Sequence, residues 1–124
     1  MSPLASTLFY VGAVLMLLDA ASYSLGAIRP IRASVKAPNA YWDRRLLLNL
    51  LLANMGLYFT GLFTLIGAGL SRTTPGAAQP VLGLGIVVCL YSGVSVPLLT
   101  ARDWPHTLPR VLAAVLIGIG LLIR

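Results

Sequence analysis

Hydrophobic residues dominate the segment 46–70, which as a helix would have two unlike faces. Large apolar side chains recur at three- and four-residue spacing along one face: Leu48, Leu52, Met55, Phe59, Leu62, Ile66 and Leu70. Small and polar side chains occupy the other: Asn49, Ala53, Gly56, Thr60 and Gly67, with Asn54, Tyr58 and Gly61 beside them. In lipid the large apolar face can stay exposed, whereas small residues let helices approach closely. We therefore expect the small and polar face to lie against other helices.

Three further apolar segments lie at about 4–28, 81–100 and 107–123. A helix needs about 20 apolar residues to cross a bilayer, so the last segment is barely long enough. The pattern predicts an all-α integral membrane protein: one domain over residues 1–124, with four transmembrane helices in an antiparallel bundle. Gly85, Cys89 and Gly93, and likewise Ala114 and Gly118, recur at four-residue spacing and predict surfaces of close helix approach, either within the bundle or between protomers.

The composition agrees with a membrane protein and disfavours a soluble one. Hydrophobic residues make up 58% of the chain and charged residues 10%, and the mean hydropathy is +0.90. Soluble domains carry about 25% charged residues. The net charge is +6, but the basic residues flank apolar segments and are not interleaved with aromatics, so we expect no nucleic-acid partner.

The basic residues are unequally divided between the two sides that four spans would create. One side holds seven: Arg29, Arg32, Lys36, Arg44, Arg45, Arg102 and Arg110. The other side holds Arg72 and Arg124. Because basic loops stay in the cytoplasm, we expect a multi-pass protein of the cell membrane with a cytoplasmic basic loop at 29–45 and both termini outside.

Asp19 interrupts the first apolar segment and is the main candidate for function. Ala5, Gly12, Asp19 and Gly26 repeat every seven residues, so Asp19 lies on a stripe of small residues that should face another helix. An ionisable residue within a span costs about 3 kcal/mol and by default marks a functional site. Two structural alternatives stay open: Asp19 is hydrated near the interface, or it pairs with an arginine.

Polar residues from all four segments fall in the same, cytoplasmic half of the predicted bundle, which indicates a crevice open to the cytoplasm. Asp19 could act there as a general acid or base, with Tyr23, Asn54 or Tyr58 orienting a substrate. Candidate substrate-binding residues are Asn49, Ser95, Arg45 and Arg110. His106 stands alone as a metal ligand, so we expect no metal and no other cofactor.

These residues leave three functions open. The first is a pocket for an amphipathic, lipid-like small molecule, either bound only or converted by cofactor-free acid/base chemistry. The second is an accessory subunit or assembly factor that docks on a larger membrane complex through its small-residue faces. The third is a proton-coupled small-molecule exporter acting as a dimer. In each case the expected partners are membrane lipids, together with a second copy of the chain or a larger membrane complex.

Overall fold

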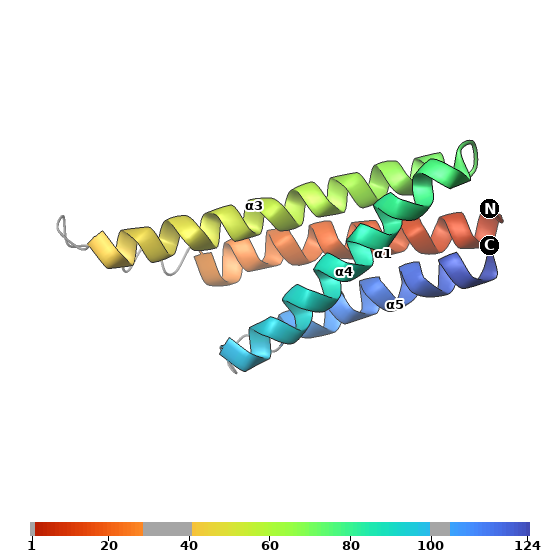
Figure 1. Cartoon of the computed structure of the whole chain (residues 1–124). Coiled ribbons are helices and arrows are strands. Elements are labelled where there is room, and N and C mark those ends of the chain that lie inside the picture. Colours follow the sequence, from red (N-terminus) through yellow and green to blue (C-terminus); the bar gives the residue numbers. More distant parts are fainter. Residues whose placement is uncertain (1, 29–40, 100–104) are drawn as a thin grey trace.

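The computed structural model describes residues 2–28, 41–99 and 105–124, and the regular elements in these ranges are helices (Figure 1). Helix α1 spans Pro3–Tyr23 and continues into the π-helical η1, Ser24–Ile28. The other three are α3 (Tyr41–Leu70), α4 (Pro75–Leu99) and α5 (Thr107–Ile123). Pro3 begins α1 without the loss of a helical hydrogen bond, because an N–H group at the first helical position has no partner within the helix. The Ser2 hydroxyl accepts a hydrogen bond from the Ala5 N–H at 3.2 Å.

The helices contact one another in a cycle in which α1 packs on α3 and α5, and α4 packs on the same two helices. Figure 1 places the N and C termini at one end of the molecule, beside the turn between α3 and α4. At this end a hydrogen bond of 2.7 Å joins the Ser6 and Ser71 hydroxyls and ties α1 to the turn. Toward the other end, α4 leans away from α3 (Figure 1).

Three helices of the described chain are long and apolar enough to cross a membrane: Pro3–Gly26, Leu47–Leu70 and Pro75–Ser95. Helix α5 is apolar but shorter. The large apolar face of α3 points away from the other helices, as the pattern predicts, since six of its seven residues, all but Leu70, are 47–56% exposed. On the opposite face Asn54, Gly61 and Gly67 are buried, whereas Asn49, Ala53 and Gly56 are exposed.

Two helices begin earlier than their apolar segments. Helix α3 starts at Tyr41, so the end of the predicted loop 29–45 is helical; residues 29–40 and Thr100 lie outside the described part. Helix α4 starts at Pro75 and not at residue 81. Proline suits the first helical position, and the Thr74 carbonyl accepts hydrogen bonds at 3.1 Å from the N–H groups of Ala77 and Ala78. Hydropathy alone missed these starts because the first turns of both helices are less apolar than their centres.

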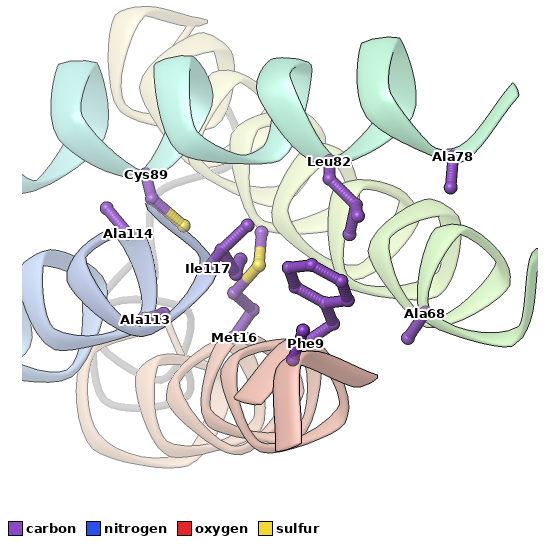
Figure 2. Packing of buried hydrophobic residues seen from close by; sticks show 10 residues of the cluster. Phe9, Met16, Ala68, Ala78, Leu82, Cys89, Ala113, Ala114 and Ile117 are labelled. Carbon is purple, nitrogen blue, oxygen red and sulfur yellow. The ribbon is translucent and has the colours of Figure 1, made fainter. Parts of the chain in front are cut away.

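The buried core is formed mainly by α1, α4 and α5, around Phe9, Met16, Leu82, Cys89 and Ile117, and α3 contributes Ala68 (Figure 2). Helices α1 and α5 pack tightly at two glycines. A Cβ atom at Gly12 would lie 2.7 Å from Ile117 Cγ1, and one at Gly120 would lie 2.5 Å from Phe9 Cε1. This tight contact fixes the register of α1 against α5. The register in turn determines which side chains of α5 lie next to Asp19.

The predicted surfaces of close approach are only partly found. A Cβ at Gly85 would lie 2.6 Å from Thr64 Oγ1, and one at Gly93 would lie 3.3 Å from Arg110 Cβ. By contrast, no described atom lies within 4 Å of a Cβ at Gly118. Gly118 therefore makes no close approach within the described part of the bundle, because α5 turns Gly120 and not Gly118 toward its neighbour. Contact of Gly118 with a second protomer stays a prediction.

Candidate functional site

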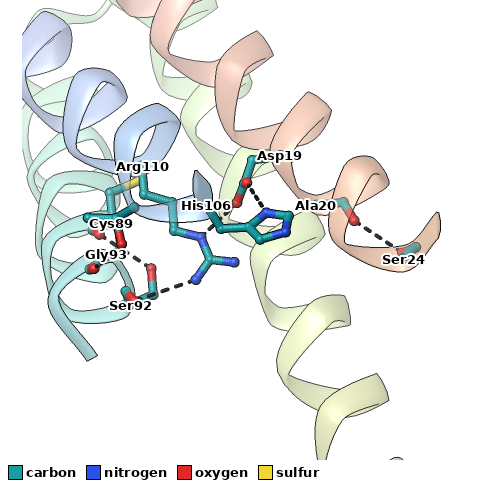
Figure 3. Close-up of polar contacts among 9 residues, drawn as sticks. Asp19, Ala20, Ser24, Cys89, Ser92, Gly93, His106 and Arg110 are labelled. Carbon is teal, nitrogen blue, oxygen red and sulfur yellow. Dashed lines mark hydrogen bonds and ion pairs between the residues drawn. The ribbon is translucent and has the colours of Figure 1, made fainter. Parts of the chain in front are cut away.

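A buried carboxylate, a buried guanidinium and a half-buried imidazole meet between α1 and the start of α5 (Figure 3). Asp19 Oδ2 accepts a hydrogen bond of 2.6 Å from Arg110 Nε, and Asp19 Oδ1 lies 2.8 Å from His106 Nδ1. His106 and Arg110 are four residues apart, so one turn at the start of α5 brings both to the same face. The side chains of Asp19 and Arg110 are only 2% and 5% exposed.

The charges of Asp19 and Arg110 balance each other in this cluster. A charge in low dielectric is costly unless it is paired and hydrogen-bonded, and both conditions hold here. Of the alternatives for Asp19, the structure therefore shows pairing with an arginine. Neither of its carboxylate oxygens is without a partner.

Tyr23 and α4 complete the cluster. The Tyr23 ring meets the His106 ring edge-on, with centroids 5.1 Å apart, and Arg110 Cζ lies 5.7 Å from the Tyr23 centroid. Arg110 Nη1 also donates to the Ser92 carbonyl at 3.5 Å, and the Thr107 hydroxyl donates to the Gly93 carbonyl at 3.0 Å. Polar contacts thus join α1, α4 and α5 at one level of the bundle.

A pocket of about 760 Å³ lies between α3 and α4, on the Arg110 side of this cluster. Its polar lining residues include Tyr23, Asn54, Ser92, Ser95 and Arg110. Its other lining residues are mostly apolar or small: Leu50, Ala53, Gly56, Leu57, Thr60, Val87, Val88 and Tyr91. The pocket lies between the two helices that diverge in Figure 1.

A smaller pocket of about 300 Å³ lies on the Asp19 side of the cluster. It is lined by Leu15, Leu18, Asp19, Ser22, Pro105, His106 and Pro109. Asp19 lines this pocket and Arg110 lines the larger one, so the ion pair stands between the two spaces. Asp19 and Asn54 therefore line different pockets. This differs from the expectation from the sequence, which placed both residues in one crevice.

Asn54 is a second buried polar group at the larger pocket. Its Nδ2 donates to the Ser24 hydroxyl oxygen, and the Ser24 hydroxyl donates to the Ala20 carbonyl at 3.1 Å. Because Ser24 has a single proton and uses it on Ala20, its oxygen acts as the acceptor for Asn54, which fixes the orientation of the amide. Asn54 Oδ1 is buried and has no hydrogen-bond partner in the described residues.

The structure brings together part of the predicted site. The larger pocket is lined by Tyr23, Asn54, Ser95 and Arg110. Asp19 does not line this pocket, but it accepts a hydrogen bond from Arg110. The Ser95 hydroxyl donates to the Tyr91 carbonyl at 2.6 Å, so its proton is engaged within α4.

The other three predicted residues lie elsewhere. Tyr58 is half-buried but does not line either pocket, and Asn49 and Arg45 are exposed and line neither. Five residues separate Asn49 from Asn54, which is about 140° around a helix, so the two amides cannot share a face. Similar depth in the membrane was the reason to group these residues, and depth does not determine the direction of a side chain.

His106 is the member of the cluster that the sequence did not indicate as a site residue. Considered alone, it lacked companions for metal binding. The available signal was its four-residue spacing from Arg110 at the start of an apolar helix, which places an imidazole and a guanidinium on one face.

Comparisons with protein family models, with curated proteins and with solved structures find no match to this chain. The geometry of the described residues therefore carries the functional argument.

Proposed function

We propose that this protein is a four-span membrane protein whose pocket between α3 and α4 binds an amphipathic, lipid-like small molecule. The apolar body of the ligand lies between the helices, and its polar head lies at Arg110 and Asn54. The observation that supports this most is a pocket of about 760 Å³ with mostly apolar walls and a buried arginine in its lining.

The pocket has the properties of a small-molecule site. Ligand pockets are about 300–1,000 Å³ in volume, mostly apolar, with a few polar groups that orient the ligand. Here Val87 and Tyr91 line the pocket and are also 63% and 77% exposed. In a bilayer these side chains would face acyl chains, so a ligand would enter sideways from the lipid.

The orientation in the membrane is part of the proposal. Arg44 and Arg45 are exposed at the start of α3, at the end of the molecule opposite the termini (Figure 1). Together with the seven-to-two division of basic residues, this supports a cytoplasmic placement of that end in an antiparallel bundle with both termini outside. The polar part of the pocket then lies in the cytoplasmic half.

The role proposed for Asp19 is to position Arg110. Both carboxylate oxygens are engaged, and Asp19 lines only the smaller pocket. A ligand in the larger pocket would meet the guanidinium first. The proposal is therefore for binding, without acid/base chemistry by Asp19 on that ligand.

The test uses the full chain in lipid nanodiscs and four single-chain probes: tetradecan-1-ol, 1-methoxytetradecane, tetradecanoate and tetradecylamine. We expect saturable binding of at least one probe, measured as a rise in the midpoint of thermal unfolding. Gly56→Leu should abolish it, because Gly56 lines the pocket and no described atom lies within 4 Å of an added Cβ, so the new side chain fills the pocket without a clash.

Gly83→Leu is the matched control, because Gly83 also has no described atom within 4 Å of an added Cβ but does not line the pocket. It should bind like the wild type. If no probe binds saturably, or if both variants bind equally well, the proposed function is wrong.

A further inference from the structure

The smaller pocket, on the Asp19 side of the cluster, has the features of a second binding site, separate from the pocket between α3 and α4. We infer that it binds a small neutral molecule with a hydroxyl group, such as a phenol, and that this hydroxyl donates a hydrogen bond to Nε2 of His106. Asp19 positions the imidazole for this role. The ligand and the place both differ from those of the function proposed above.

Asp19 determines which nitrogen of His106 carries the proton. The carboxylate accepts a hydrogen bond of 2.6 Å from Arg110 Nε through Oδ2, and its Oδ1 lies 2.8 Å from His106 Nδ1. An ionised carboxylate only accepts hydrogen bonds, so Nδ1 is the donor in this contact. In a neutral imidazole the other nitrogen then has a free lone pair. His106 therefore offers Nε2 as a hydrogen-bond acceptor.

Nε2 of His106 is also open to a ligand. Within the described residues the His106 ring makes its hydrogen bond through Nδ1, and Nε2 makes none. Among the described side chains that are not exposed, Asn54 Oδ1 is the one nitrogen or oxygen atom that is both fully buried and unpartnered. Nε2 is unpartnered as well, so it must keep accessible surface. Figure 3 shows this nitrogen on the side of the ring away from the Arg110 guanidinium.

The size and lining of the pocket limit what it can bind. Its volume is about 300 Å³, and a cavity of about 150 Å³ is enough for a benzene molecule. One aromatic ring with a short substituent therefore fits, whereas a whole lipid chain is larger than the pocket. Leu15, Leu18, Pro105 and Pro109 supply apolar surface beside His106. Leu18 is 61% exposed, so the pocket opens toward the surrounding lipid.

A neutral hydroxyl suits this pocket better than a charged group or a metal ion. Both Asp19 oxygens have partners, and Arg110 balances the Asp19 charge. An ammonium group would add an uncompensated positive charge, which is costly in low dielectric, and a carboxylate has no proton to donate to Nε2. A zinc ion takes about four ligands, and the described residues include no group of three His, Cys, Asp or Glu side chains that could hold a metal.

The test observes the imidazole itself, because the chain contains a single histidine. The untagged full chain, labelled with ¹⁵N-histidine, is measured by NMR in lipid nanodiscs at pH 8, where a histidine side chain is ordinarily neutral. Without ligand we expect the proton on Nδ1. Titration with 4-ethylphenol should shift the Nε2 resonance saturably, because the lone pair accepts the phenol proton in a hydrogen bond.

The methyl ether 1-ethyl-4-methoxybenzene is the matched probe, since it keeps the ring and the oxygen but has no proton to donate. It should leave the Nε2 resonance unshifted and compete with the phenol with an affinity about tenfold weaker.

Ser22→Phe tests the location of the site. Ser22 lines the pocket and is exposed, so a phenylalanine there can cover the pocket without disturbing the core. It should abolish the saturable shift of Nε2. Thr7→Phe is the control, because Thr7 is also an exposed hydroxyl residue of α1 but lines neither pocket. It should respond to the phenol like the wild type.

Three results would each overturn the inference: a proton on Nε2 in the ligand-free protein, the same response of Nε2 to phenol and ether, or equal phenol binding by Ser22→Phe and the wild type. The two probes on the wild type decide the matter even if Ser22→Phe does not fold. Binding of the tetradecyl probes to the larger pocket enters none of these results, so a failure here is distinct from a failure of the proposed function.

Discussion

At the scale of single residues, the pair of Asp19 and Arg110 dominates the energetics of the site. The contact is buried and short, at 2.6 Å. We expect Asp19→Asn to lower the free energy of unfolding by about 3–5 kcal/mol, because the variant leaves the Arg110 charge buried without a counter-charge. The measurement is thermal and denaturant unfolding of both proteins in nanodiscs.

A double-mutant cycle separates loss of the ion pair from loss of shape. Arg110→Met alone leaves the Asp19 charge buried without a counter-charge. This variant should therefore also lower the free energy of unfolding strongly. The double variant Asp19→Asn/Arg110→Met carries neither charge, so it should be more stable than either single variant. Additive losses would show that the two side chains do not depend on each other, contrary to the geometry.

The sequence allowed one part of this cluster to be predicted. The seven-residue repeat of Ala5, Gly12, Asp19 and Gly26 predicted that the carboxylate faces the bundle. Ala5, Gly12 and Asp19 are buried, whereas Gly26, in η1, is exposed, so the repeat holds only within α1. The partners Arg110 and His106 could not be assigned, because they depend on the register of α1 against α5. That register follows from tight packing at Gly12 and Gly120, which hydropathy does not reveal.

At the scale of helices, the contact of α1 with α5 makes a testable contrast between two glycines of α5. A Cβ at Gly120 would lie 2.5 Å from the fully buried Phe9 ring and 3.2 Å from the Ala5 carbonyl, whereas Gly118 has open space. We expect Gly120→Ala to destabilise the protein by about 1–3 kcal/mol through overpacking. Unfolding in nanodiscs would measure it.

Gly118→Ala is the control on the same helix. It should be neutral or slightly stabilising, because alanine has the higher helix propensity and nothing obstructs its methyl group. A larger loss for Gly118→Ala than for Gly120→Ala would mean that α5 is rotated relative to the arrangement described above.

The existence of the helices was the most predictable feature, and their ends were the least. The four apolar segments each correspond to a helix. The starts of α3 and α4 depend on local hydrogen bonding, such as the Thr74 carbonyl ahead of Pro75, which an average over apolar residues cannot detect. The pocket was predictable only as a polar level in the bundle, since its walls depend on how α4 leans from α3.

At the scale of the whole molecule, the proposed orientation can be tested with single cysteines. The native Cys89 is buried and can be replaced by alanine. Thr73, in the turn after α3, and Arg44, near the start of α3, are both exposed. In intact cells we expect a membrane-impermeant maleimide to label Thr73→Cys, and to label Arg44→Cys only after the cells are opened. The reverse pattern would mean an inverted protein.

The most direct test of ligand binding is to locate a bound molecule in the membrane-embedded protein. A tetradecan-1-ol with a mid-chain diazirine would be photolysed with the protein in nanodiscs, and adducts would be mapped by peptide mass spectrometry. We expect adducts at pocket residues such as Leu57, Val88 and Tyr91, removed by excess tetradecan-1-ol and absent in Gly56→Leu. Adducts confined to the outward face of α3, at Leu52 and Phe59, and insensitive to competitor would show that the alcohol only dissolves in the surrounding lipid, which would contradict a ligand site between α3 and α4.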